Sequence, residues 1–225
     1  MVVIGLTGGI ACGKSTVAAL LARHGFGVVD ADSLSREVTA PGQPAYREIV
    51  ATFGDTILLP DGRIDRPALG RRVFADPDAR RRLESITHGA IGAASADAFA
   101  RLSAAGHTLV VYEAALLVET GRHTTFPALI VVTAPREVQL ARLLARNPEL
   151  TPADAGARIA SQMPLDQKAA VATHLLVNDG DLDALGREVT RLAQDLRDRF
   201  DVGVPRQTND DRTGRGDAAR SGGPS

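Results

Sequence analysis

The sequence predicts a three-layer α/β/α fold with a five-stranded parallel sheet. Short apolar runs alternate with longer segments of helical periodicity, and this alternation is typical of a parallel sheet with helices on both faces. The runs that we assign to strands are residues 2–7, 28–32, 108–112, 128–132 and 174–177. With 225 residues, the chain is long enough for one such core and a small inserted subdomain.

Local patterns predict the helices between the strands. Val17, Leu20 and Leu21 recur at helical spacing after the first strand and indicate a helix over 13–23. Residues 33–106 are expected to be mostly helical, because their helical patterns are interrupted only by short turn signals. We expect this stretch to form a helical insertion.

The second half of the chain carries clear helix signals. Pro135 suits a first helical position and predicts a helix that begins there. Thr151 and Pro152 are typical of an N-cap and a first position, and predict a second helix that carries Arg158. Apolar residues recur every three or four positions over 182–200, which predicts an amphipathic helix.

These elements suggest a division of the chain. We expect a single domain over 1–203 and, because residues 204–225 lack aromatic residues and are rich in Gly, Asp, Arg and Ser, a disordered tail. Within the domain, the core is expected to comprise 1–32, 107–135 and 170–203, the insertion 33–106, and a helical lid about 136–169.

The composition excludes several classes of protein. The formal net charge of -1 gives no general footprint for nucleic-acid or membrane-surface binding. One cysteine cannot form an internal disulfide, and no apolar run is long enough to cross a bilayer. We therefore expect a cytoplasmic protein, a monomer by default, without nucleic-acid or membrane partners. Only two residues are lysines, Lys14 and Lys168.

A glycine-rich motif follows the first strand. Residues 8–15, GGIACGKS, match G-x-x-x-x-G-K-[ST], and the motif opens a predicted helix as a phosphate-binding loop does. Backbone N–H groups and the helix N-terminus would bind phosphate, Lys14 would reach the β- and γ-phosphates, and Ser15 would hold Mg²⁺. Thr16 would contact the α-phosphate. The nucleotide-binding residues are therefore predicted to be Gly9, Ile10, Ala11, Cys12, Gly13, Lys14, Ser15 and Thr16.

Two alternatives apply to this loop. A glycine-rich turn with a chance Lys-Ser pair would look similar, but the full motif in its strand-to-helix context makes this alternative much weaker. Cys12 occupies a variable position, where a small loop residue is favoured over a nucleophile. The sequence thus predicts a P-loop NTPase.

Carboxylates follow the second and third strands. In a parallel sheet the carboxyl ends of neighbouring strands face one crevice, so Asp32 could accept the proton of an attacking hydroxyl beside the phosphate loop. Asp30 could hold a metal-bound water or orient its neighbours, and Glu113 could associate with the metal. The alternatives are helix capping by Asp32-Ser33 at a helix from Leu34, and a strand-end surface charge for Glu113.

Several arginines could complete the site. Arg36 would lie one turn into the helix after Asp32 and suits an anionic acceptor. Arg142 and Arg146 are four residues apart and share a helix face, so they could close over a triphosphate as part of a lid. The alternative is a solvated helical hairpin with weak surface ion pairs. Lys168 could join the lid or be a surface lysine.

The chain resembles the dephospho-CoA kinase family from Val3 to about Phe200. The stretches that carry this resemblance are GLTGGIACGKST, VVDADSLSREV, PGQPAYREIVATFGDTIL with DGRIDRPALGRRVF, ITH, ALLVE, QLARLLAR and RIASQMPLDQKAAVATHLLVNDG. The phosphate loop alone is generic, but its combination with the other stretches is specific. The resemblance implies ATP-dependent phosphorylation of the ribose 3′-hydroxyl of dephospho-CoA, with Mg²⁺, on a nucleotide-kinase-like core.

The resemblance also implies roles for individual residues. Asp32 matches the catalytic base, and Arg142 or Arg146 matches a lid arginine. Arg36, His88 and Leu116 correspond to the acceptor site with Asp30 and Asp32, while Asn178 lies where adenine is contacted. Two departures affect the acceptor pocket, because Gly89 and Ala115 stand where the family usually has proline.

Two other functions remain open from the residues. The first is a kinase with another acceptor, such as a nucleoside monophosphate or a small alcohol, in which only residues 33–106 differ in role. The second is a nucleotide-dependent switch. Guanine specificity lacks support because Asn178-Asp179-Gly180-Asp181 has no lysine, and Asp32 favours transfer to a hydroxyl over simple hydrolysis.

Overall fold

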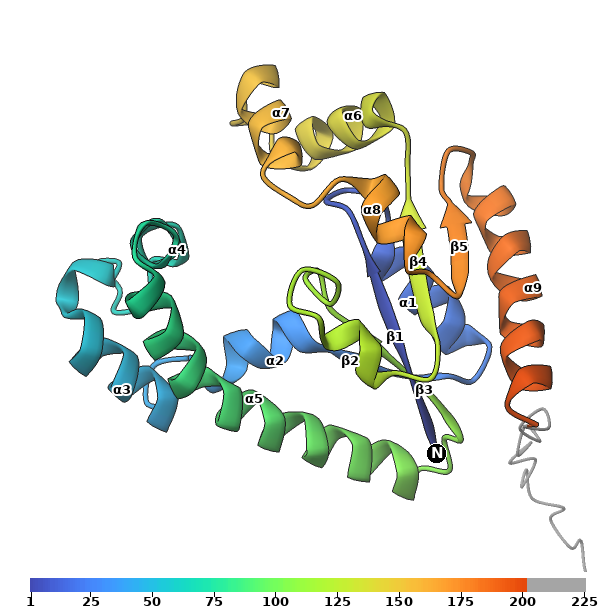
Figure 1. Ribbon diagram of the computed structural model, residues 1–225, viewed down its shortest axis with the longest axis horizontal. Coiled ribbons are helices and arrows are strands. Elements are labelled where there is room, and N and C mark those ends of the chain that lie inside the picture. The colour runs from blue at the N-terminus through green and yellow to red at the C-terminus, as the bar shows by residue number, and fades with distance from the viewer. Residues whose placement is uncertain (202–225) are drawn as a thin grey trace, which may run out of the picture.

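A computed structural model describes residues 1–201 of the chain, and the predicted tail at 204–225 lies outside them. Figure 1 shows a sheet flanked by helices and a helical lobe that projects from one side. The elements are β1 (Val2–Gly8), α1 (Lys14–Arg23), β2 (Gly27–Asp30), α2 (Ala31–Val38), α3 (Pro44–Phe53), η1 (Asp55–Ile57), α4 (Arg66–Ala75), α5 (Pro77–Ala104), β3 (Leu109–Glu113), η2 (Arg122–Thr125), β4 (Leu129–Thr133), α6 (Arg136–Arg146), α7 (Pro152–Ala160), α8 (Leu165–Ala170), β5 (His174–Val177) and α9 (Leu182–Arg199).

The five strands form one parallel sheet in the order β2-β3-β1-β4-β5, as predicted. The register pairs Leu6 with Glu113 and Glu113 with Asp30. All three residues therefore lie at the carboxyl ends of their strands, where β1 is about to enter the glycine-rich loop. This edge is where open α/β sheets bind ligands.

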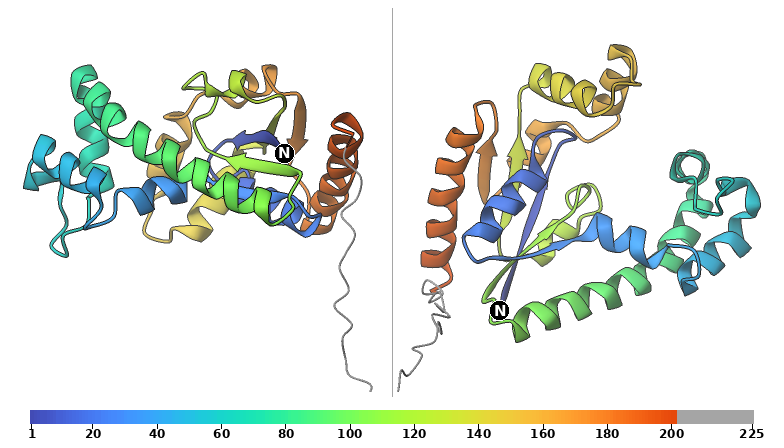
Figure 2. Two further views of the ribbon diagram at one scale, coloured as in Figure 1. Left: turned by 90° about the horizontal axis from the view of Figure 1, so that it is seen from below. Right: turned by 180° about the vertical axis from the view of Figure 1, so that it is seen from behind.

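Each face of the sheet has its own core. On one face, α1 and α9 pack through Val17, Leu21, Val189 and Leu196, each fully buried. On the other face, Ala98 of α5 and Leu117 pack with strand residues such as Val110 and Val131. Figure 2 shows these layers from two further directions. The apolar pattern predicted over 182–200 is confirmed, with α9 ending at Arg199.

The insertion is helical and has a small core of its own. Ile49, Phe53, Ile57, Ile64 and Leu69 are buried there, apart from the two cores of the sheet. The long α5 leaves this lobe and continues until its second half packs on the sheet, as Ala98 shows. The second half of α5, which belongs to the segment 33–106, therefore also covers one face of the sheet.

Several element boundaries differ from the predicted ones. β2 ends at Asp30, and α2 begins directly at Ala31, because the Asp30 side chain caps that helix. Pro135 is the N-cap of α6 and lies one residue before the first helical position. At α7 the prediction is confirmed, since Thr151 and Asp154 form a reciprocal capping box around Pro152.

Candidate functional site

The glycine-rich loop has a backbone that only glycine can adopt at two positions. Gly8 has φ 154°, and a Cβ there would lie 2.1 Å from the Val132 carbonyl oxygen. Gly13, the N-cap of α1, has φ 94°, and a Cβ there would lie 2.3 Å from Asn178 Nδ2. The loop therefore curls tightly against β4 and the segment after β5 before α1 begins.

Lys14 lies over this loop. Its Nζ donates hydrogen bonds to the Gly8 and Gly9 carbonyl oxygens, at 3.3 and 3.1 Å. Burial lowers the pKa of Lys14, because the charged ammonium loses water, and the negative charge of Glu113 opposes this shift. The positive charge thus lies beside the N-terminus of α1, where backbone N–H groups and the helix dipole also favour an anion.

Three side-chain amides hold the loop from outside. Gln139 of α6 donates to the Ile10 carbonyl at 2.7 Å, and Gln162 accepts from the Ile10 N–H at 2.7 Å. Asn178 donates to the Cys12 carbonyl at 2.8 Å. Sequence reasoning did not single out either glutamine, because an isolated Gln in a helix carries no motif signal. Gln139 and Gln162 belong to the predicted lid, so hydrogen bonds link this lid to the loop.

Cys12 is a structural residue of the loop. Its side chain is fully buried, and its Sγ accepts a hydrogen bond from Gln139 at 3.2 Å. Burial raises the pKa of the thiol, so the thiolate needed for nucleophilic chemistry is disfavoured. The prediction of a small loop residue fits this geometry.

Ser15 and Glu113 are joined across the crevice. Ser15 Oγ donates to Glu113 Oε1 at 2.9 Å. Glu113 is only 6% exposed, so the alternative of a strand-end surface charge is wrong. Burial raises the pKa of Glu113, the Ser15 hydrogen bond opposes the shift, and the neighbouring charge of Asp30 reinforces it.

The two aspartates after β2 have different surroundings. Asp30 Oδ1 accepts from the Asp32 and Ser33 N–H groups at 2.9 and 3.0 Å, so Asp30 is the helix cap. The alternative of a helix cap at Asp32 is therefore wrong, because Asp32 already lies in α2. This leaves the Asp32 carboxylate available to a ligand.

Asp32 is an electrostatically unusual carboxylate. Partial desolvation at the crevice and the nearby charge of Asp30 raise its pKa, while Lys14, Arg36 and the Ala115 backbone N–H act in the opposite direction. A proline at position 115 would lack that N–H. Alanine in place of the family's usual proline at position 115 therefore affects the pKa of the Asp32 carboxylate.

Arg142 and Arg146 face the loop from α6. Together with Ala11, Gly13, Lys14, Ser15 and Thr16 they line a cavity of about 210 Å³. Arg142 donates to the Asn178 carbonyl at 3.1 Å and to Asn178 Oδ1 at 3.2 Å. Asn178 therefore lies at the junction of loop and lid, and its side chain is turned toward the loop.

The residues predicted for the acceptor lie on the other side of the crevice. Arg36 lines a second cavity of about 530 Å³ together with Thr39 and Arg66. Arg66 donates to Thr39 Oγ1 at 2.7 Å, and burial together with Arg36 lowers its pKa. His88 on α5 is exposed, and Leu116 is 51% exposed, so both are accessible to a ligand.

Lys168 is not a surface lysine. It lies on α8 and is fully buried, with Nζ 2.6 Å from Glu119 Oε1. Nζ also donates to the Ala115 carbonyl oxygen at 3.0 Å, which accepts from Thr7 Oγ1 at 3.1 Å as well. Lys168 thus fixes the loop that follows Glu113 to the base of the lid.

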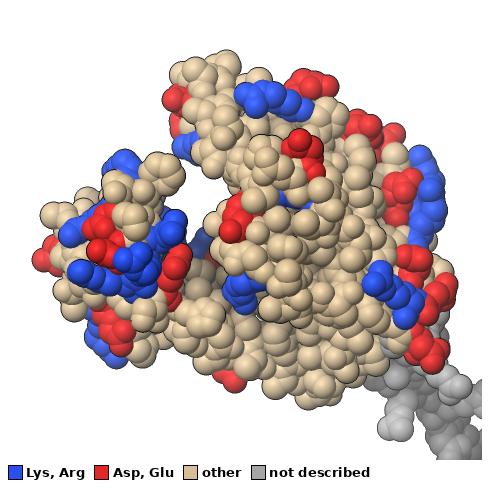
Figure 3. Space-filling model, viewed as in Figure 1, with Lys and Arg blue, Asp and Glu red and all other residues tan. Residues whose placement is uncertain are grey.

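Figure 3 shows an open cleft between the lobe of α3 and α4 and the body of the molecule. Lys and Arg side chains gather on that lobe together with Asp and Glu, while much of the body beside and below the cleft is uncharged.

Within residues 1–201, no helix has the length and apolar character needed to cross a membrane.

Comparisons with known proteins identify the family of this chain. A family model described as dephospho-CoA kinase matches residues 2–184. The dephospho-CoA kinase of Anaeromyxobacter dehalogenans is 54% identical over 197 residues, covering 88% of this chain and 93% of the relative. That of Geobacter metallireducens is 50% identical over 192 residues, covering 85% and 95%.

Solved structures with a similar fold are also known. The crystal structure of TT1252 from Thermus thermophilus superposes with a TM-score of 0.74 at 33% identity, covering 87% of this chain and 97% of that one. The dephospho-CoA kinase from Campylobacter jejuni superposes with a TM-score of 0.61 at 26% identity, covering 88% and 98%. The structural similarity therefore extends over most of this chain.

Proposed function

Because this chain belongs to the dephospho-CoA kinase family, we propose that the crevice between the phosphate loop and α2 is its active site. The enzyme phosphorylates the ribose 3′-hydroxyl of dephospho-CoA with ATP, which gives CoA and ADP in the last step of CoA biosynthesis. One observation carries the site proposal. Lys14, the Ser15–Glu113 pair and the Asp32 carboxylate, which does not cap α2, meet at one edge of the sheet.

Asp32 is the proposed general base. It accepts the proton of the 3′-hydroxyl as the hydroxyl oxygen attacks the γ-phosphorus, and the bond from that phosphorus to the β–γ bridging oxygen breaks to release ADP. Its raised pKa suits this role, since a base works best when its pKa approaches the working pH. Asp30 acts indirectly, because it caps α2 and thereby sets the position of Asp32.

Positive charges around the loop stabilise the transferring phosphoryl group. Lys14 meets the β- and γ-phosphates from the loop, and the loop N–H groups hold the phosphates. Arg142 and Arg146 approach from α6 and line the same cavity. Because Arg142 is already fixed by Asn178, we assign positioning of the triphosphate to Arg142 and direct neutralisation of the transferring group to Arg146.

The donor set fits Mg²⁺. Ser15 and Glu113 present hard oxygen atoms beside the loop, and Mg²⁺ usually takes one or two protein ligands together with phosphate oxygens and water. Among residues 1–201 no group of three His, Cys, Asp or Glu side chains forms a ready metal cage, which agrees with such a shared site. When bound, the ion would neutralise phosphate charge.

The remaining assignments concern substrate recognition. Arg36, His88 and Leu116 are proposed to contact dephospho-CoA, because they are accessible on the acceptor side of the crevice. Asn178 and the segment after it are proposed to lie against the adenine of ATP. We also propose a cytoplasmic monomer, which fits one buried cysteine and a balanced charge; light scattering of the purified enzyme tests the monomer.

The experiment that tests the function measures ADP and CoA formation with Mg²⁺-ATP. Purified enzyme is supplied with dephospho-CoA, AMP, CMP or shikimate as the acceptor. We expect strong stimulation of ADP release by dephospho-CoA alone, with CoA as the product. Equal stimulation by another acceptor, or slow hydrolysis of ATP that no acceptor changes, would contradict the assigned substrate.

A further inference from the structure

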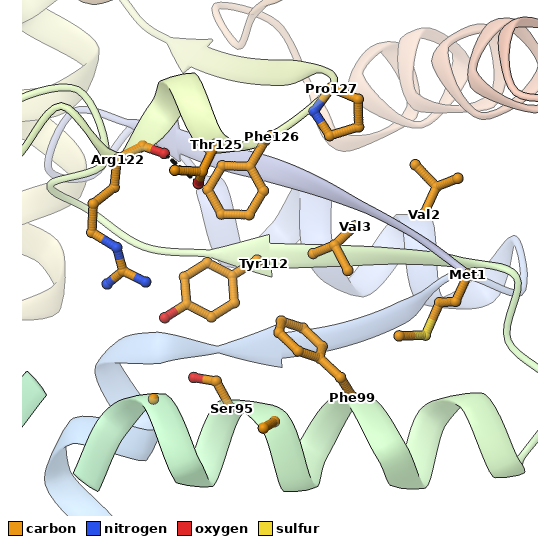
Figure 4. A pocket seen from close by; sticks show the side chains of 12 residues that line it. Met1, Val2, Val3, Ser95, Phe99, Tyr112, Arg122, Thr125, Phe126 and Pro127 are labelled. Atoms are coloured by element: carbon orange, nitrogen blue, oxygen red, sulfur yellow. Dashed lines mark hydrogen bonds between the residues drawn. The ribbon is translucent and has the colours of Figure 1, made fainter. Parts of the chain in front are cut away.

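A large cavity opens on the face of the sheet opposite α1 and α9. It lies between α5 and the segment 122–127 and has a volume of about 610 Å³, within the range of small-molecule sites. Figure 4 shows its walls, formed by Val3, Phe99 and Phe126, and the Arg122 guanidinium at one end. We call it the α5 pocket. None of the residues that line it has a role in the active site described above.

Two buried hydroxyl groups face this pocket without partners. Ser95 is 7% exposed and Tyr112 is 1% exposed, and among the described residues neither hydroxyl oxygen makes a hydrogen bond. Figure 4 shows both hydroxyls on the side of the pocket nearer Arg122. Buried polar groups are normally paired, because leaving one unpaired is unfavourable. The two hydroxyls therefore indicate a polar partner that enters the pocket.

Aromatic side chains pack against the Tyr112 ring. The Tyr112 ring stacks on Phe126 with centroids 5.6 Å apart and an interplanar angle of 26°. Phe99 packs against the same ring at 5.9 Å, and the Arg122 guanidinium carbon lies 5.6 Å from its centroid. Arg122 is the one charged side chain that lines the pocket. The pocket thus suits a ligand with an apolar body, hydrogen-bonding groups and an anionic end.

Two elements connect the pocket to the active site. Tyr112 immediately precedes Glu113 on β3, so the pocket lies close to the strand end that carries the active site, with the two side chains on opposite faces of the sheet. On α5, Gly92, Ser95 and Phe99 follow His88 by four, seven and eleven positions and share its helix face. At 1.5 Å per residue, that face extends about 16 Å away from His88.

We infer that the α5 pocket binds the pantetheine arm of dephospho-CoA while the ribose lies at Asp32. This inference rests on the function assigned above. The arm carries a dimethyl-substituted carbon chain, a hydroxyl and two amides, and it is attached to a diphosphate. Phe99 and Phe126 contact the carbon chain, the Ser95 and Tyr112 hydroxyls bond to the amides, and Arg122 pairs with the diphosphate.

Kinetics with dephospho-CoA as the acceptor test the inference. Gly92→Leu fills the pocket from α5, because a Cβ at Gly92 meets nothing within 4 Å, and Tyr112→Phe removes only a hydroxyl. We expect Gly92→Leu to raise the KM for dephospho-CoA by at least about tenfold and Tyr112→Phe by about 2- to 10-fold, with the KM for ATP unchanged.

Gly186→Leu is the matched control, since Gly186 lies on α9 with the same open space around it. It should leave all KM values unchanged. Light scattering is measured for each variant, because a second copy of the chain could cover the pocket instead. If Gly92→Leu changes the oligomeric state but not the KM for dephospho-CoA, the inference is overturned in favour of that contact.

Intrinsic fluorescence gives a readout that does not depend on turnover. The chain has two tyrosines and no tryptophan, so Tyr46→Phe leaves Tyr112 as the single strong fluorophore. We expect 4′-phosphopantetheine, which is the arm without the nucleotide, to change Tyr112 emission saturably in this variant and to compete with dephospho-CoA. AMP, which shares the adenosine of dephospho-CoA but lacks the arm, should leave the emission unchanged.

The outcomes separate the pocket from the function. An unchanged Tyr112 signal with 4′-phosphopantetheine, or a normal KM for dephospho-CoA in both pocket variants, would overturn the pocket assignment while CoA formation by the unmodified enzyme still stands. Absence of CoA formation by the unmodified enzyme would overturn the function itself. If Gly92→Leu does not fold, Tyr112→Phe and the fluorescence titration still decide the question.

Discussion

Replacing Lys168 by methionine should destabilise the enzyme strongly, although Lys168 lies outside the catalytic crevice. The substitution Lys168→Met keeps most of the side-chain volume but removes the ammonium that lies 2.6 Å from Glu119 Oε1. Lys168 is fully buried and the Glu119 side chain is 20% exposed, so the remaining carboxylate has little access to water. The Ala115 carbonyl keeps a donor, Thr7 Oγ1 at 3.1 Å.

The magnitude follows from the burial of the pair. Removing one partner of a buried ion pair costs about 3–5 kcal/mol, because an uncompensated charge remains inside the protein. For a domain of this size, that loss corresponds to a fall in Tm of about 6–20 °C. The double substitution Lys168→Met with Glu119→Leu removes both charges and should restore most or all of the stability, since an apolar pair of similar volume is often as stable.

Urea unfolding and thermal melts of both variants provide the assay. The exposed pair Arg80–Glu84, with a separation of 3.7 Å and side chains 63% and 66% exposed, supplies a matched control. Arg80→Met should change stability by less than about 1 kcal/mol. A loss for Lys168→Met as small as that of the control, or a double variant as unstable as the single one, would refute the buried-pair argument.

Three further predictions concern the crevice. Asp32→Asn should lower kcat by roughly 10²–10⁴-fold with ATP affinity kept, the usual contribution of a general base; an equal loss of ATP affinity would instead make Asp32 a metal or structural residue. Lys14→Ala should abolish turnover, and near-normal activity would refute its contact with the β- and γ-phosphates. The folded pKa of Asp32 is raised above its ordinary value of 3.8, so its ionisation disfavours the folded state as pH rises through that window. Asp32→Asn should therefore stabilise the enzyme to urea at pH 7, and the gain should vanish as pH falls toward 3.8; a gain independent of pH would contradict the shift.

Two glutamine side chains connect the predicted lid to the phosphate loop. Gln139 lies on α6 and Gln162 follows α7, yet both bond to the backbone of Ile10. A movement of α6 and α7 would therefore act directly on the loop that binds phosphate. This arrangement depends on contacts between residues about 130 and 150 positions apart in the chain, so no local sequence pattern contains it.

Local sequence determined much of this molecule. The glycine-rich loop requires Gly8 and Gly13 because a Cβ at either would collide with its neighbours, and that requirement is visible as a motif. The alternation of apolar runs and helical patterns predicted the parallel sheet, since the central strands β1, β3 and β4 are buried on both faces. Thr151 and Asp154 form their capping box from residues three positions apart, which a sequence pattern can also capture.

The tertiary structure decided which polar residues are paired. Asp30 and Asp32 look equivalent in sequence, but the start of α2 at Ala31 makes Asp30 the cap and leaves Asp32 free. From the sequence alone, Lys168 could be a surface residue. In the structure it is buried and pairs with Glu119, because α8 packs against the loop after β3. Such roles follow from burial and from contacts over long sequence separations, and local spacing carries no information about either.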